Sequence, residues 1–322
     1  MLNIDQHSRN IYFAIPPLKM NPISVEHISK KFAGVNALDD ISFRVDKGEL
    51  FGFIGPDGAG KTTLFRILTT LIIPDTGKAL INGLDVVKDY KKIRQDIGYM
   101  PGRFSLYSDL SVEENLNFYA TVFGTSIAEN YELIKDIYIQ IEPFKKRKAG
   151  KLSGGMKQKL ALSCALIHKP SVLILDEPTT GVDAVSRLEF WEMLKRLKHI
   201  GITIIVSTPY MDEASLCDRV ALIQDGKIMT MRSPAEIIKT YPWKLFSVKS
   251  DDIFRLLNDL RQISQAYTVF AFGQSAHVSF KEDQENEESL FEYLKTKGHS
   301  GLKISQATAT IEDCFMELMM KS

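Results

Sequence analysis

At residues 55–62 the chain reads Gly55-Pro56-Asp57-Gly58-Ala59-Gly60-Lys61-Thr62, which fits the pattern G-x-x-x-x-G-K-[ST] at every fixed position. The stretch follows an aliphatic segment, Glu49–Ile54, that predicts a buried strand, and it opens the predicted helix Lys61–Leu71. A strand, a glycine-rich loop and a helix are the context in which this pattern binds phosphate. A turn that merely joined the strand to the helix would leave the adjacent Lys-Thr pair unexplained. The sequence therefore predicts a nucleotide phosphate site.

The predicted phosphate loop gives each residue type a chemical role. Glycines let backbone N–H groups close around phosphate oxygens, and the positive end of the following helix adds to the attraction. The Lys61 ammonium can reach the β- and γ-phosphates, and the Thr62 hydroxyl can ligate Mg²⁺. The nucleotide-binding residues expected on this basis are Gly55, Pro56, Asp57, Gly58, Ala59, Gly60, Lys61, Thr62 and Thr63.

A second aliphatic strand, Ser171–Leu175, is followed by two carboxylates, Asp176 and Glu177. Because a buried parallel strand delivers its carboxyl end to the ligand crevice, these side chains are expected to lie near the phosphate loop. Asp176 is expected to hold Mg²⁺, and Glu177 to polarise an attacking water as a general base. A lone Asp-Glu pair is common at surfaces, but beside a phosphate loop it indicates a hydrolytic site.

A second anion site is predicted where Leu152-Ser153-Gly154-Gly155-Met156-Lys157-Gln158 enters the predicted helix Ser153–Ile167. A hydroxyl and free N–H groups at a helix start can face a phosphate. The two phosphate-binding helix ends need not serve the same nucleotide.

The segments GPDGAGKTT, LSGGMKQ, VLILDE and EPTTGVD, in this order, resemble the ATP-binding subunits of ABC transporters, and the resemblance spans about residues 23–235. It implies an α/β fold in which a P-loop NTPase core carries an antiparallel β subdomain and an α-helical signature subdomain. It also implies that ATP and Mg²⁺ are bound and that two subunits sandwich two ATP molecules. The resemblance assigns Asp183 to a loop crossing the dimer interface, and it assigns to the partner's nucleotide Ser153, Gly154, Gly155 and Gln158.

Phe32 is the position where the family usually places an aromatic ring against adenine. The alternative is a core phenylalanine on the predicted β layer Ser24–Val45, which also contains Phe43. We favour stacking, since an uncharged base needs an apolar platform.

Two positions depart from the family pattern. Gly102 stands where the family has a glutamine that touches Mg²⁺ and the attacking water, and Pro209 stands where it has a histidine that contacts the γ-phosphate. Neither residue has a side chain able to do so. We therefore predict firm ATP binding and slow hydrolysis at this chain's own Walker site, in a heterodimer rather than a homodimer. A site compensated by other groups and a scaffold that never hydrolyses are the alternatives.

The remaining organisation follows from length and composition. The chain has 322 residues, which is longer than one hydrophobic core usually supports, so more than one domain is expected. Its 40 Lys+Arg balance its 40 Asp+Glu, and this even charge argues against nucleic acid as a partner. The expected parts are an N-terminal extension at residues 1–20, either an upstream start choice or native, the ABC ATPase at 21–240 and a small α+β accessory domain at 243–322.

The partners and location follow from the same resemblance. No apolar stretch approaches the roughly 20 residues that span a bilayer, and the three widely spaced cysteines fit a reducing compartment. We expect a cytoplasmic protein, peripheral on the inner face of the membrane, driving separate permease subunits of an exporter. The expected contact residues are Phe104, Leu106 and Tyr107, with a buried hydrophobic turn as the alternative. A soluble ABC-type ATPase without a transporter is the rival function, and a small-molecule kinase is weaker because it would not need LSGGMKQ.

Overall fold

The computed structural model describes residues 21–281 and 287–321. The predicted N-terminal extension, residues 1–20, lies outside the described residues, and so does most of an acidic stretch at 282–288.

A six-stranded sheet forms the centre of the molecule, in the strand order β10-β9-β3-β8-β7-β6. Five of these strands run parallel, and only the edge strand β10 is antiparallel to its neighbour β9. Every residue of β3, β7 and β8 is buried, as expected for strands covered on both faces. The strands are β3 (Leu50–Ile54), β6 (Ile97–Met100), β7 (Val172–Asp176), β8 (Thr203–Thr208), β9 (Arg219–Gln224) and β10 (Lys227–Arg232). The predicted buried strands and the α/β class are confirmed.

An antiparallel layer covers one face of this sheet, as the sequence predicted for Ser24–Val45. It joins to the central sheet through a cluster of aromatic rings in which Phe43 lies 4.9 Å from Phe53, and Phe53 lies 6.1 Å from Phe65 of α1, between ring centroids. The strands are β1 (Ile23–Phe32), β2 (Val35–Val45), β4 (Thr76–Ile81) and β5 (Leu84–Asp85), in the order β2-β1-β4-β5.

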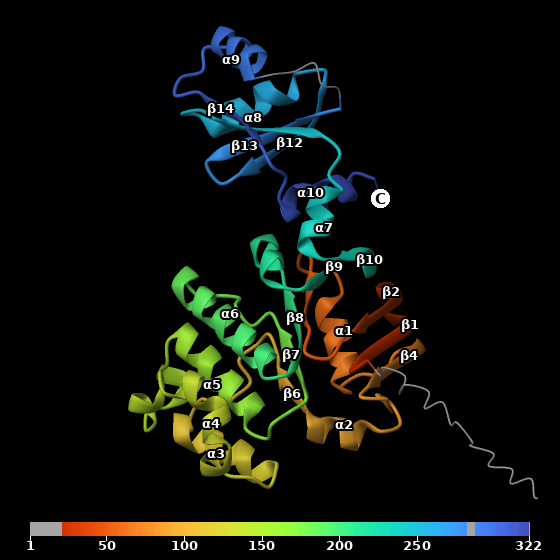
Figure 1. Cartoon of the computed structure of the whole chain (residues 1–322), viewed down its shortest axis with the longest axis vertical. Helices are drawn as coiled ribbons and strands as arrows, with labels where there is room; N and C mark the ends of the chain where they lie inside the picture. The colour runs from red at the N-terminus through yellow and green to blue at the C-terminus, as the bar shows by residue number, and fades with distance from the viewer. Residues whose placement is uncertain (1–20, 282–286, 322) are drawn as a thin grey trace, which may run out of the picture.

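Helices cover both faces of the central sheet, and α3, α4 and α5 gather on one side of it (Figure 1). They are α1 (Lys61–Leu68), α2 (Tyr90–Asp96), α3 (Val112–Val122), α4 (Ile127–Tyr138), α5 (Gly154–Leu166) and α6 (Ala184–His199), with short 3-10 turns at η1 (Glu142–Phe144), η2 (Ala149–Lys151) and η3 (Met211–Leu216).

Helix α1 is shorter than predicted. Its backbone leaves the helical region at Thr70, whose φ of 63° is left-handed. The Thr69 hydroxyl also donates to the carbonyl of Phe65, which satisfies one acceptor of the last turn. Leu71, predicted as the last helical residue, is 54% exposed and lies beyond this stop.

The C-terminal part is built on a second four-stranded antiparallel sheet, in the order β12-β13-β11-β14, with a separate apolar core. Its elements are β11 (Lys244–Lys249), α8 (Ile253–Arg261), β12 (Ala266–Phe272), β13 (Ser275–Phe280), α9 (Glu287–Thr296) and β14 (Lys303–Ala307).

The last helix, α10 (Ile311–Met319), does not join that separate core. It packs on η3 and on α7 (Pro234–Lys239), and Figure 1 shows α7 and α10 between the two sheets. Its buried Ile311, Cys314 and Phe315 belong to the hydrophobic core of the part that carries the phosphate loop. The tail expected at residues 243–322 therefore contributes its final helix to its neighbour.

Candidate functional site

The phosphate loop connects the end of β3 to the start of α1 and forms one wall of a cavity of about 330 Å³. Gly60 caps α1 with a φ of 105°, and a Cβ atom there would lie 2.4 Å from the carbonyl oxygen of Ala37. Only glycine fits both constraints, so the loop can approach the β layer closely. The cavity is lined by Ala37, Asp57, Gly58, Gly60, Lys61, Thr62, Thr63 and Glu177.

Lys61 lines this cavity and its side chain is only 3% exposed. Its ammonium donates hydrogen bonds to the carbonyls of Gly55 (2.8 Å) and Pro56 (2.9 Å). The same atom lies 3.3 Å from Glu177 Oε1. An ammonium held at the mouth of a glycine-rich loop beside a helix N-terminus is suited to polyphosphate.

The end of β7 brings the predicted magnesium residues together. Thr62 Oγ1 donates to Asp176 Oδ1 at 3.2 Å, and Ser207 Oγ at the end of β8 donates to the same oxygen at 2.7 Å. Hydroxyl and carboxylate oxygens are the hard ligands that Mg²⁺ prefers, with the remaining positions taken by substrate oxygens and water. Within residues 21–281 and 287–321 there is no group of three or more His, Cys, Asp or Glu side chains that could hold a metal ion by themselves. The residues present fit a nucleotide-bound magnesium ion.

Glu177 is fixed by its backbone. Its φ of 48° is left-handed, and its N–H donates to both the hydroxyl (3.0 Å) and the carbonyl (3.1 Å) of Ser207. A left-handed non-glycine residue is uncommon and costs free energy, so such residues concentrate at functional sites. The strain points the carboxylate, 21% exposed, into the cavity with Lys61.

The two departures from the family pattern lie beside these groups. A Cβ atom built on Gly102 would be 3.2 Å from the carbonyl oxygen of Asp176 and 3.8 Å from its Oδ2, so a side chain at this position would start next to the predicted magnesium ligand. Pro209 directly follows β8, two residues after Ser207.

The predicted signature residues lie apart from this cavity. Ser153 caps α5 by accepting a hydrogen bond from the Met156 N–H at 3.3 Å. Cβ atoms built on Gly154 and Gly155 would meet the Gly181 carbonyl at 3.3 Å and the Ser186 hydroxyl at 2.7 Å. Gln158 packs in the same region. The start of α5 thus abuts the loop whose Asp183 caps α6, through a hydrogen bond from the Ser186 N–H.

Phe32 lies at the end of β1 and is 47% exposed, with the Lys30 ammonium 5.4 Å from its ring centroid. The alternative that Phe32 is a core residue is therefore wrong. Its stacking on adenine stays a prediction, and Phe32 does not line the cavity of the phosphate loop.

Known proteins share the sequence features that form this site. The profile of the ABC transporter family matches residues 38–180, which include the phosphate loop, the signature and the carboxylates Asp176 and Glu177. The Nod factor export ATP-binding protein I of Burkholderia lata is 33% identical over 309 residues, which cover 92% of this chain and 96% of that protein. The chain belongs to the ATP-binding proteins of ABC transporters.

Two further proteins place this ABC protein among its relatives. The probable multidrug ABC transporter ATP-binding protein YbhF of Escherichia coli (strain K12) is 36% identical over 304 residues. The match covers 92% of this chain and 52% of YbhF, so the chain spans about half the length of that relative. A solved ABC ATP-binding cassette, described as a dimeric post-hydrolysis state bound to ADP and Pi, superposes with a TM-score of 0.59 at 25% identity, covering 66% of this chain and 98% of that one.

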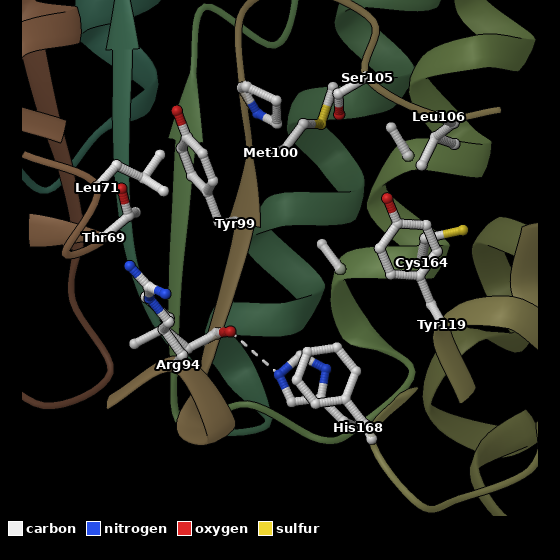
Figure 2. A pocket seen from close by; sticks show the side chains of 15 residues that line it. Thr69, Leu71, Arg94, Tyr99, Met100, Ser105, Leu106, Tyr119, Cys164 and His168 are labelled. Atoms are coloured by element: carbon white, nitrogen blue, oxygen red, sulfur yellow. Dashed lines mark hydrogen bonds between the residues drawn. The ribbon is translucent and has the colours of Figure 1, made fainter. Parts of the chain in front are cut away.

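A second, mostly apolar cavity of about 430 Å³ lies between β6 and the helices of the signature subdomain of this ABC protein (Figure 2). Figure 2 shows Tyr99 on the side of β6 where Thr69, Leu71 and Arg94 lie, and Met100 on the opposite side, toward Tyr119 and Cys164. Burial, with a smaller contribution from the charge of Asp176, raises the pKa of Tyr99 to about 12, so its phenol stays neutral.

The three predicted contact residues near this cavity differ in exposure. Phe104 and Tyr107 are exposed, whereas Leu106 is buried and lines the cavity. The expectation of an exposed Leu106 is wrong, because that side chain joins the hydrophobic core of the signature subdomain. His168 also lines the cavity and stacks on Phe123 with ring centroids 3.7 Å apart, and burial lowers the pKa of His168.

None of the helices in the described residues is long and apolar enough to cross a membrane.

Three residues of the site were not predicted from the sequence. Ala37 supplies a wall of the phosphate cavity from β2, and Ser207 forms hydrogen bonds with both Asp176 and Glu177. The signal that could have revealed Ser207 is its place at the end of the β-branched run Thr203–Ser207, which is typical of a buried strand. Glu213 is buried behind the site and accepts hydrogen bonds from three separate segments.

Proposed function

We propose that this protein binds and hydrolyses ATP as one subunit of a dimeric membrane exporter. The observation that carries the proposal is the meeting of Lys61 and Thr62 with Asp176 and Glu177 in one cavity, at the ends of β3 and β7. The names of its relatives support export, because one is an export ATP-binding protein and another a probable multidrug transporter subunit.

The chain's own residues divide the work of hydrolysis. The backbone N–H groups of the loop and the Lys61 ammonium hold the phosphates, and Thr62 and Asp176 hold Mg²⁺. Magnesium, when bound, neutralises charge on the phosphate oxygens. Glu177 orients the attacking water and accepts its proton, since its carboxylate is held beside Lys61. The Ser207 hydroxyl keeps Asp176 in place.

Hydrolysis at this chain's own site is slow in our proposal. Gly102 and Pro209 supply neither a side chain to the attacking water nor one to the γ-phosphate. A positioned acid–base group is typically worth about 10²–10⁴-fold in rate. ATP binding depends on the phosphate loop and on Mg²⁺, and the residues of the loop and the proposed magnesium ligands are all present.

A heterodimer follows from the same division. Ser153, Gly154 and Gly155 keep the helix start that serves the nucleotide of a partner subunit. Paired with a different ATP-binding subunit, the chain would complete the partner's site while its own retains ATP longer. The dimeric ADP-bound cassette that superposes on this chain supports a dimer of this kind, though not the identity of the second subunit.

The apolar cavity between β6 and α5 is the proposed contact with separate permease subunits at the inner face of the membrane. Its lining is mostly apolar, and Phe104 and Tyr107 stand exposed beside it. A contact of this kind, rather than a membrane span of its own, would hold the subunit at the membrane.

The test is ATP hydrolysis by the pure chain and by the chain with its co-purified membrane partners, each beside the Glu177→Gln variant. We expect ATP to bind in both preparations, with a low rate from the lone chain and a higher rate in the complex. A fast, Glu177-dependent rate from the lone chain would contradict the slow site. ATP binding with no hydrolysis in either preparation would favour a scaffold, and recovery with ribosomes in place of a permease would overturn export.

A further inference from the structure

Glu213 is a buried carboxylate that the preceding mechanism does not use. It lies in η3, four residues after Pro209, and its side chain is 2% exposed. Burying a carboxylate costs several kcal/mol unless partners replace its lost water. The hydrogen-bond partners of Glu213 therefore indicate which part of the structure this buried carboxylate stabilises.

Three segments of the ATP site converge on this carboxylate. Thr208, the last residue of β8, and Thr179, two residues after Glu177, both donate their hydroxyls to Oε2, at 2.5 Å and 3.1 Å. Arg187, in the first turn of α6, donates from Nε to Oε1 at 3.0 Å. Both threonines are buried, so solvent cannot replace the carboxylate as their partner.

Each of these segments carries a residue of the proposed mechanism. Thr179 follows the catalytic Glu177, Thr208 precedes Pro209, and α6 begins at Asp183 of the dimer-interface loop. The helix is also tied to the loop by the Arg187 N–H, which donates to the Asp183 carbonyl at 2.9 Å. One side chain thus fixes the relative positions of the hydrolytic carboxylate, the switch position and the interface loop.

Arg187 completes the arrangement on its exposed side. Its guanidinium lies 4.1 Å from the Tyr210 ring centroid and 3.2 Å from Asp212 Oδ2. Burial by itself would lower the pKa of Arg187, but the charges of Glu213 and Asp212 outweigh it and raise that pKa. The carboxylate consequently faces a permanent cation and two hydroxyls, which is a fully satisfied buried network.

We propose that Glu213 is a positioning residue for ATP hydrolysis, which holds the Glu177 loop, the end of β8 and the start of α6 in register. The inference rests on the proposed hydrolysis of ATP. A misplacement of about 1 Å at a reacting group can cost roughly 100-fold in rate. Loosening this network should therefore lower kcat while leaving ATP binding, which depends on the phosphate loop, nearly unchanged.

The test measures kcat, KM and the Kd of ATP for the full chain with its co-purified membrane partners. Glu213→Gln keeps the size of the side chain but removes the charge that Arg187 faces. We expect kcat to fall by about 10- to 100-fold and the Kd to change by less than about 2-fold. Glu192→Gln, on the exposed part of α6 where Glu192 pairs with Lys195, is the matched control and should leave both unchanged.

A second pair of variants keeps the test valid if Glu213→Gln does not fold. Thr208→Val removes only the hydroxyl, and Thr208→Ser retains it. The inference requires that Thr208→Val lowers kcat and that Thr208→Ser keeps kcat near the wild-type value, with equal thermal stability of the two variants.

The outcomes separate the inference from the function on which it depends. A wild-type rate that depends on Glu177 but is unaffected by Glu213→Gln and Thr208→Val would overturn the positioning role alone. Equal losses in kcat and in ATP affinity would show a structural role and would also overturn it. A wild-type complex that binds ATP without hydrolysing it would overturn the proposed hydrolysis first, and the positioning role with it.

Discussion

Removing the ring of Phe315 should destabilise the ATPase part, although the residue lies near the C-terminal end of the chain. Phe315 is 4% exposed in α10 and belongs to the same core cluster as Ala214 of η3 and Ile237 of α7. Core Phe→Ala substitutions cost about 3–5 kcal/mol, since they forfeit apolar burial and leave a cavity. At about 2–4 °C per kcal/mol for a domain of about 150–250 residues, Phe315→Ala should lower the Tm by about 6 to 20 °C.

The matched control is Phe254→Ala in α8. Phe254 is 79% exposed, so the same chemical change removes almost no buried contact and should stay within about 0.5 kcal/mol. Both variants and the wild type are compared by thermal unfolding followed by circular dichroism at one scan rate, with ATP and Mg²⁺ absent. A shift for Phe315→Ala no larger than that for Phe254→Ala would refute the packing of α10 into the ATPase core.

Three further predictions concern the site and the thiols. Restoring the family side chains in Gly102→Gln with Pro209→His should raise kcat, by up to about 10²-fold for each group, and an unchanged kcat with intact ATP binding would contradict the slow site. Lys61→Ala should weaken binding of a fluorescent ATP analogue by about 10- to 100-fold, because it removes a charged hydrogen-bonding group, whereas the exposed control Lys91→Ala should bind as wild type. The three cysteines are free and buried, and burial raises the pKa of each thiol, so little thiolate exists at neutral pH. A thiol reagent should therefore label them only after unfolding in guanidinium, and rapid labelling of the native chain at neutral pH would contradict this burial.

The central fold could be predicted because its signals are local. The phosphate loop and the aliphatic strands that end beside it each lie within a few consecutive residues. The end of α1 could not be placed, since the left-handed Thr70 belongs to a turn that the apolar spacing does not reveal. Boundaries depend on such single residues, whereas the type of an element depends on many.

Glu213 and α10 could not be predicted for a different reason. The partners of Glu213 lie 5, 26 and 34 residues away in the sequence, so no spacing indicates that they meet. The apolar face of α10 is readable as a pattern, but the pattern does not say which core it joins. Contacts between distant segments are set by the tertiary fold, and those of Glu213 include Thr179, two residues after the proposed general base Glu177.

The position of α10 determines how the C-terminal part can act on the ATP site. Its Asp313 forms a buried hydrogen bond with His277 of β13 at 2.9 Å, and its Glu317 accepts one from the Trp243 indole at 3.3 Å. These polar contacts tie α10 to the accessory sheet, while Phe315 on the same helix is buried in the ATPase core. The helix is therefore held by polar contacts on one side and by apolar burial on the other. Because α10 packs directly on η3, and η3 carries Glu213, this helix provides a continuous structural connection between the accessory sheet and the segments that Glu213 holds.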